Sequence, residues 1–291
     1  MIVYLNGEYV DESEAKVSID DRGFLFADGV YEVAHVYGGT LFEWRRHRDR
    51  LRHSLEVVRI RGVDLDELDR AADTLLEHFR AEMARRNEPA DGSLYVEVTR
   101  GAHPRAHLFP DPPVRPTVVM WIRPVEPIPA ELVERGVKVI TVPDDRWSKV
   151  WIKTVGLLSN VLAKQYAHDR GAFEAIYVRD GIVTECTSAN LFIVQQGTLR
   201  TAPVSNYILP GVTREVVLEI AQEEGLPVNL TPFGVDEVYT ADEVFLTGTL
   251  TEVLPITQVD DVRIGTRAGP VALRLRRLLH ERAGVLKRSS T

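Results

Sequence analysis

The sequence has only one cysteine among its 291 residues, Cys186, so no intramolecular disulfide can form. Chains without disulfides are typical of reducing compartments. The first residues show no basic segment followed by an apolar core, as a secretory signal would. No apolar run reaches the roughly 18 residues that cross a bilayer. These absences predict a cytoplasmic protein with no membrane partner, in which Cys186 is a small packed residue.

Basic residues are fewer than acidic residues in this sequence. The chain has 35 Lys and Arg residues against 43 Asp and Glu residues, a net charge of −8. An acidic surface repels phosphate backbones and anionic lipids, so no nucleic acid partner is expected. Glycine patterns of the Walker or Rossmann type are also missing, which disfavours nucleotides. A small molecule is therefore the expected ligand of an otherwise ordinary globular composition.

The length exceeds the roughly 100 to 200 residues of a usual domain, which predicts two domains. Closely spaced prolines at Pro124, Pro127 and Pro129 lack N–H donors for helix or sheet, so we place an interdomain linker at 124–130. Residues 1–123 are expected to form a smaller α+β domain. Residues 131–291 are expected to form a larger α/β domain.

Turn residues and apolar periodicity predict the elements. In the first domain they indicate strands at 2–5, 8–10, 29–37, 40–44, 93–99 and 116–123, and helices at 45–60 and 64–85. In the second domain they indicate strands at 137–142, 174–178, 182–185, 190–194, 198–200 and 243–247, and helices at 156–170, 213–224 and 269–283, with a short helix before 137. The tail at 287–291 is expected to be disordered.

Lysine is scarce, and Lys153 stands in the apolar run at 150–155. A buried ammonium group is costly unless it is paired, and desolvation favours the neutral amine that Schiff-base chemistry requires. Locally, a lysine that extends to solvent is the commoner case. Glu185 ends an apolar strand before small and hydroxyl residues, which let a flat ring approach. Its carboxylate suits a protonated pyridine nitrogen, although strand-end glutamates usually face solvent.

Three further segments have the chemistry of a ligand site. At 208–215, a Pro-Gly pair leads into a helix, whose first N–H groups suit a phosphate. The hydroxyl-rich segment 247–252 follows a strand and could complete that seat. The long loop at 101–115 contains Arg105 and His107, which suit a carboxylate. Each signal is weak alone, since most helices begin near Thr or Gly and most basic loops are simply solvated.

Taken together, these motifs resemble the fold-type IV pyridoxal-phosphate enzymes, or class IV aminotransferases. That family includes branched-chain aminotransferases, D-amino acid transaminases and aminodeoxychorismate lyase. Residues 20–32 look like its opening signature, and residues 47–51 look like its helix with a phosphate-binding arginine, Arg50. Segments 152–154 and 183–190 look like its lysine and glutamate motifs. The resemblance runs in order over nearly the whole chain.

The resemblance implies that Lys153 forms the Schiff base with pyridoxal 5′-phosphate and then moves the Cα proton of the substrate. Glu185 would pair with the pyridine nitrogen, and no metal is implied. The other implied cofactor contacts are Arg50, Ser188, Asn190, Leu209, Val212, Thr213 and Thr249. The departures from the family pattern are modest. Thr187, Ala189 and Gly248 stand where serines are common or frequent.

Arg105 and His107, with Tyr31, look like the substrate-carboxylate trap of D-amino acid transaminases, which branched-chain enzymes generally lack. The implied reaction moves the amino group of a D-amino acid such as D-alanine or D-glutamate to pyruvate or 2-oxoglutarate, in a ping-pong cycle. The resemblance also implies a homodimer with the active site at the interface, which this loop enters from the neighbouring subunit. The alternatives are a branched-chain L-amino-acid aminotransferase and, third, an aminodeoxychorismate lyase.

Overall fold

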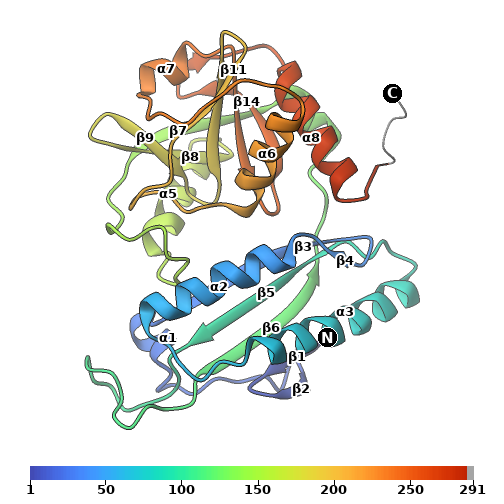
Figure 1. The fold of residues 1–291 in the computed structure, drawn as a ribbon, viewed down its shortest axis with the longest axis vertical. Coiled ribbons are helices and arrows are strands. Elements are labelled where there is room, and N and C mark those ends of the chain that lie inside the picture. The colour runs from blue at the N-terminus through green and yellow to red at the C-terminus, as the bar shows by residue number, and fades with distance from the viewer. Residues whose placement is uncertain (287–291) are drawn as a thin grey trace. The chain divides into compact units, whose positions relative to one another are not determined.

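The computed structural model describes residues 1–286 and divides into two compact units (Figure 1). The first unit is Met1–Glu126 with Ile152–Leu157, and the second is Pro127–Trp151 with Leu158 onward. The chain therefore passes between the units three times, whereas the sequence analysis placed one linker, at 124–130. The excursion Ile152–Leu157 brings Lys153 into the first unit instead of the second. The tail predicted to be disordered lies outside the described residues.

The first unit is built on a six-stranded antiparallel sheet in the order β2-β1-β6-β5-β3-β4. The strands are β1 Ile2–Leu5, β2 Glu8–Asp11, β3 Gly29–Tyr37, β4 Thr40–Leu41, β5 Gly92–Thr99 and β6 Thr117–Pro124. Its helices are α1 Arg22–Phe26, α2 Trp44–Val58 and α3 Leu65–Arg86. The two predicted hairpins and two long helices are confirmed. The strand expected at 40–44 stops at Leu41, because α2 already begins at Trp44.

Local chemistry explains these elements. The Asn6-Gly7 turn takes positive φ angles of 54° and 100°, as a tight hairpin requires. Helix α3 begins at Asp64, whose side chain accepts hydrogen bonds from the N–H groups of Asp66 and Glu67. The apolar stripes of α2 and α3 pack on one face of the sheet (Figure 1). Their buried residues include Leu51, Leu55, Leu68, Leu75, Phe79 and Met83.

The second unit is built on a nine-stranded mixed sheet in the order β12-β11-β10-β13-β14-β7-β8-β9, with β15 paired to β14. The strands are β7 Val137–Pro143, β8 Glu174–Arg179, β9 Ile182–Cys186, β10 Asn190–Gln195, β11 Thr198–Thr201, β12 Val228–Asn229, β13 Glu243–Gly248, β14 Glu252–Val259 and β15 Val262–Arg263. The helices are α4 Ala130–Arg135, α5 Leu158–His168, α6 Val212–Glu223, α7 Val235–Tyr239 and α8 Pro270–Arg282. Strand β14, which the sequence analysis missed, pairs antiparallel with β13 and parallel with β7.

The core of the second unit lies between this sheet and its helices and includes Val139, Ile176, Leu191, Leu246 and Leu254. Cys186 is buried within it, as expected, and burial raises the pKa of its thiol well above the ordinary value. Among residues 1–286, the structure contains no helix with the length and apolar character needed to cross a membrane.

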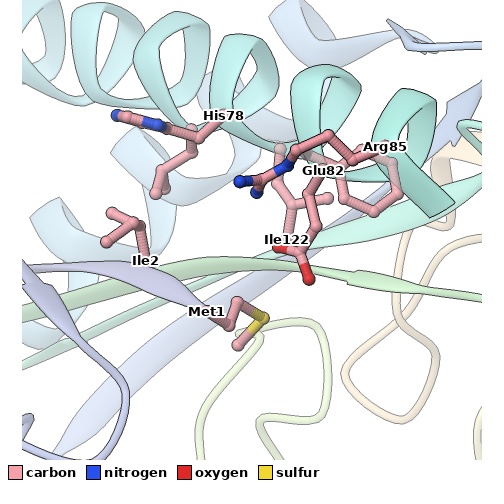
Figure 2. A pocket seen from close by; sticks show the side chains of 8 residues that line it. Met1, Ile2, His78, Glu82, Arg85 and Ile122 are labelled. Atoms are coloured by element: carbon pink, nitrogen blue, oxygen red, sulfur yellow. The ribbon is translucent and has the colours of Figure 1, made fainter.

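A pocket of about 250 Å³ lies in the first unit between α3 and the start of β1 (Figure 2). His78, Glu82 and Arg85 of α3 line one side, and Ile2 and Ile122 lie across from them. No residue that the sequence analysis proposed for the functional site lines this pocket. The residues proposed for the functional site therefore lie elsewhere in the described chain.

Candidate active site

The segment that contains Lys153 lies alongside β3 in the first unit. The N–H of Tyr31 donates to the Lys153 carbonyl at 3.0 Å, and the N–H of Val155 donates to the Gly29 carbonyl at 3.1 Å. The Lys153 Nζ lies 3.3 Å from the Tyr31 hydroxyl, to which it donates, and 4.3 Å from the centre of the Tyr31 ring. The structure thus brings the predicted Schiff-base lysine against one member of the predicted carboxylate trap.

Arg50 is oriented by a carboxylate that the sequence analysis did not single out. Its Nε and Nη2 donate to the two oxygens of Glu32 at 2.7 and 2.8 Å. The Nδ1 of buried His47 lies 2.8 Å from Glu32 Oε2. Burial alone would raise the pKa of Glu32, but the charge and hydrogen bonds of Arg50 hold it at about 2. Burial lowers the pKa of His47. Because an ionised carboxylate can only accept, Nδ1 of His47 is the donor to Glu32.

In the second unit, the buried carboxylate of Glu185 binds two of the other predicted residues. Its Oε2 accepts from Asn190 Nδ2 and from the N–H of Leu209, both at 3.0 Å. Asn190 Nδ2 also donates to the Leu209 carbonyl at 3.0 Å. Glu185, Asn190 and Leu209 therefore form one hydrogen-bonded group, although 24 residues separate the first from the last. A fixed carboxylate of this kind suits a cationic ring nitrogen.

Arg146 is the partner of Glu185 that sequence reasoning missed. Its Nη1 donates to Glu185 Oε1 at 2.7 Å, and its Nε and Nη2 form a fork on Asp144 at 2.9 Å each. Burial would lower the pKa of Arg146, but Asp144 and Glu185 raise it, so the guanidinium stays charged. Burial would likewise raise the pKa of Asp144, but Arg146 lowers it. The detectable signal was a charged run directly after an apolar strand and shortly before Lys153.

The predicted phosphate seat begins α6. Val212 and Thr213 form its first turn, after Gly211 at the N-cap position, and both are buried. A Cβ on Gly211 would stand 2.1 Å from Asn190 Oδ1. Only a residue without a side chain lets the start of α6 approach Asn190 this closely. The N–H groups of the first turn are the donors that a phosphate would use.

Thr249 lies in the turn between β13 and β14, directly after Gly248. A Cβ on Gly248 would stand 2.6 Å from Thr251 Oγ1 and 3.3 Å from the Ser188 carbonyl, which explains why glycine occupies this position. The hydroxyls of Thr247 and Thr251 are buried without a hydrogen-bond partner among residues 1–286. Buried hydroxyls are normally satisfied, so acceptor oxygens of a phosphate fit this turn.

Glu174 fixes the Thr187–Ser188 turn by two hydrogen bonds. It is a second carboxylate that the sequence analysis missed. Thr187 Oγ1 donates to Glu174 Oε1 at 2.5 Å, and Ser188 Oγ donates to Glu174 Oε2 at 3.1 Å. Lys164 Nζ also donates to Oε2, at 3.0 Å. Thr187 is one of the departures from the family pattern, but its hydroxyl still donates a hydrogen bond in this network.

Arg105 and His107 lie exposed on the loop between β5 and β6. The Arg105 guanidinium carbon lies 5.1 Å from the centre of the Phe26 ring, and the centre of the His107 ring lies 5.4 Å from the same Phe26 centre. Within residues 1–286, the structure shows no hydrogen bond from either side chain to Tyr31 or Lys153. The structure therefore does not join the three predicted trap residues within this single chain.

Comparison with known proteins shows which family the chain belongs to. The model of the amino-transferase class IV family matches residues 29–259. The chain belongs to the class IV aminotransferases. This confirms the resemblance read from the motifs, including the fold-type IV fold.

Two curated class IV relatives cover nearly all of the chain. It is 41% identical over 269 residues to a D-alanine aminotransferase of Staphylococcus epidermidis, which covers 91% of this chain and 93% of that one. It is 40% identical over 272 residues to a D-alanine aminotransferase of Bacillus licheniformis, covering 93% of each. The structure is similar to the branched-chain aminotransferase of the archaeon Thermoproteus uzoniensis with norvaline, with a TM-score of 0.84 and 28% identity over 99% of this chain and 96% of that one.

Class IV aminotransferases use pyridoxal phosphate, and a structurally similar branched-chain amino acid aminotransferase, with a TM-score of 0.85, contains pyridoxamine 5′-phosphate. The described residues of this chain fit such a cofactor. Lys153 offers an amine, and the buried carboxylate of Glu185 suits the ring nitrogen. The first turn of α6, with the unsatisfied hydroxyls of Thr247 and Thr251, suits the phosphate. The family match confirms that the cofactor is pyridoxal phosphate, while the residues assigned to it stay predictions.

Proposed function

We propose that this class IV aminotransferase transfers the amino group of a D-amino acid, such as D-alanine or D-glutamate, to pyruvate or 2-oxoglutarate. The observation that supports the choice of a D-amino acid is the Arg105–His107 pair on the exposed loop after β5. The pair offers a planar cationic fork and an imidazole for an α-carboxylate. The D-alanine aminotransferase relatives, about 40% identical to this chain, support the same choice.

Bound pyridoxal phosphate supplies the electron sink for the reaction. Lys153 Nζ would provide the covalent attachment for this group and would take the proton from the substrate Cα. The Tyr31 hydroxyl, 3.3 Å from Nζ, orients that amine. Glu185 would hold a proton on the ring nitrogen by a charge-assisted hydrogen bond, and Arg146 fixes its carboxylate by donating to Oε1. Arg50, held by Glu32, would bind the phosphate, and so would Val212, Thr213 and Thr249.

The quaternary structure belongs to the same proposal. We propose a homodimer in which the loop at 101–115 enters the active site of the neighbouring subunit. Arg105 and His107 are exposed in their own chain, which leaves them available to a second copy. The substrate carboxylate would then be bound by Tyr31 of one subunit and by this pair from the other. The single, buried Cys186 is consistent with a cytoplasmic enzyme.

The test is a visible absorbance spectrum of the purified protein with pyridoxal phosphate, followed by D-alanine or L-leucine in separate cuvettes. Loss of the cofactor band with D-alanine alone, together with release of pyruvate, is the expected result. Loss of the band with L-leucine alone would instead assign the branched-chain reaction. Failure to acquire any band would contradict a transaminase of either kind.

A further inference from the structure

One buried arginine fixes the backbone of the loop that contains Arg105 and His107. Arg22, at the start of α1, is only 3% exposed. Its Nη1 donates to the carbonyls of Ala106 and Leu108, at 2.5 and 3.3 Å, and its Nη2 donates to the carbonyl of His107 at 3.5 Å. Three successive carbonyls of one turn therefore share a single guanidinium that lies more than 80 residues away in the sequence.

The other end of the same short helix contacts the side chains of this loop. Phe26 lies one helical turn after Arg22, whose guanidinium carbon is 4.9 Å from the centre of its ring. The same ring is 5.1 Å from the guanidinium carbon of Arg105 and 5.4 Å from the ring centre of His107. Helix α1 therefore contacts both the backbone of the turn and the two side chains assigned to the substrate carboxylate.

Helix α1 is itself fixed to the sheet of the first unit. Asp21 accepts hydrogen bonds from the N–H of Gly23 at 2.8 Å and from Thr99 Oγ1 at 3.0 Å. Asp28 accepts from Arg22 Nε at 2.8 Å and from Arg100 Nε at 2.7 Å. Burial would raise the pKa of Asp28, but the two arginines lower it, so the pairing stays ionic. The loop is therefore anchored to a rigid part of its own unit.

We infer that Arg22 and Phe26 are positioning residues for substrate-carboxylate binding, because they hold the turn that presents Arg105 and His107. This inference rests on the proposed function. Both residues act through the loop and not on the cofactor, so their loss weakens binding of every substrate whose carboxylate meets the loop. The amino acid and the oxo acid share that carboxylate, so both KM values change together.

The test compares the unaltered enzyme with Arg22→Lys and Phe26→Leu. Lysine keeps the charge but cannot bond Asp28 and three carbonyls at once. In Arg22→Lys we expect the KM for D-alanine and for 2-oxoglutarate to rise roughly tenfold, the factor expected from the loss of about one charge-assisted hydrogen bond. In Phe26→Leu, which removes the cation–π contact with Arg105, we expect both KM values to rise about two- to fivefold. The kcat should stay within about twofold and the cofactor band should be unchanged. Amide hydrogen exchange should accelerate in the 101–115 peptide and not in α3.

Arg80→Lys is the matched control. Arg80 also binds a backbone carbonyl of the first unit, that of Gly39 at 2.6 Å, but it does not contact the loop. Its KM values should stay unchanged. Unchanged KM values in Phe26→Leu, or a fall in its kcat alone, would overturn the inference. If Arg22→Lys does not fold, Phe26→Leu alone decides the test. If the unaltered enzyme binds cofactor but does not consume D-alanine, the proposed function fails instead.

Discussion

Among single residues, Arg146 has a large expected effect on stability, because it is the cation that Asp144 and Glu185 share in the interior of the second unit. Replacing one partner of a buried ion pair costs roughly 3 to 5 kcal/mol. We expect Arg146→Leu to lower the free energy of unfolding by that order and to weaken retention of the cofactor. Urea unfolding and the visible spectrum measure the two effects. Arg146→Lys keeps the charge and should lose less, so equal losses would contradict this account.

The ionisation of Glu32 should make the free energy of unfolding depend on pH. Its folded pKa of about 2 lies below the ordinary value of 4.5, so its contribution to stability is complete above pH 4.5 and disappears as the pH falls toward 2. In Glu32→Gln this component should be missing, and the fall in unfolding free energy across that pH interval should be shallower than in the unaltered protein. Denaturant titrations at several pH values test this. Parallel curves for the two proteins would rule out the role given to Glu32.

At the scale of elements, the start of α6 depends on the absence of a side chain at Gly211. Alanine there would place its Cβ 2.1 Å from Asn190 Oδ1, so either the helix start or Asn190 has to move. We expect Gly211→Ala to destabilise the protein by about 1 to 3 kcal/mol and to loosen the cofactor. Gly234→Ala is the control, because its nearest atom is 3.2 Å away and its φ of −92° suits alanine. Comparable losses in both variants would contradict the explanation.

Elements whose signals are local could be predicted from the sequence, and elements that depend on distant partners could not. The turns at Asn6-Gly7 and Asp180-Gly181 specify their hairpins through backbone angles alone. Strand β14 was missed because Pro255 argues against a central strand and because its pairing with β7 joins segments far apart in the chain. Helix α1 was missed because five residues give no periodicity.

The residues of the candidate site also fall into those with a local sequence signal and those that depend on distant partners. The sequence singles out Lys153, Glu185 and Asn190 because they lie in segments that resemble the lysine and glutamate motifs of the family, and their roles stay predictions. Arg146 and Glu32 could not, since a lone arginine or glutamate shows its role only when the fold reveals its partner. Glu185 lies 39 residues from Arg146, and Arg50 lies 18 residues from Glu32.

At the scale of the whole molecule, the proposed loop exchange predicts that two inactive variants can restore each other. Lys153→Ala lacks the reacting amine, and Arg105→Met lacks the carboxylate fork. In a homodimer, a mixed pair would contain one site with both groups intact, so an equal mixture reassembled from subunits should regain about a quarter of the unaltered activity. Activity of reassembled mixtures measures this. No recovery, with mixed dimers shown to form, would mean that each loop serves its own chain.

The excursion of Ile152–Leu157 into the first unit also bears on how the chain folds during synthesis. When the ribosome has produced residues 1–126, Gly29 and Tyr31 of β3 still lack the backbone partners that Val155 and Lys153 supply. The first unit can therefore be completed only after much of the following segment has emerged. The first unit cannot be completed before residues 127–151 of the second have been synthesised, so the lysine reaches its place only after that segment has emerged.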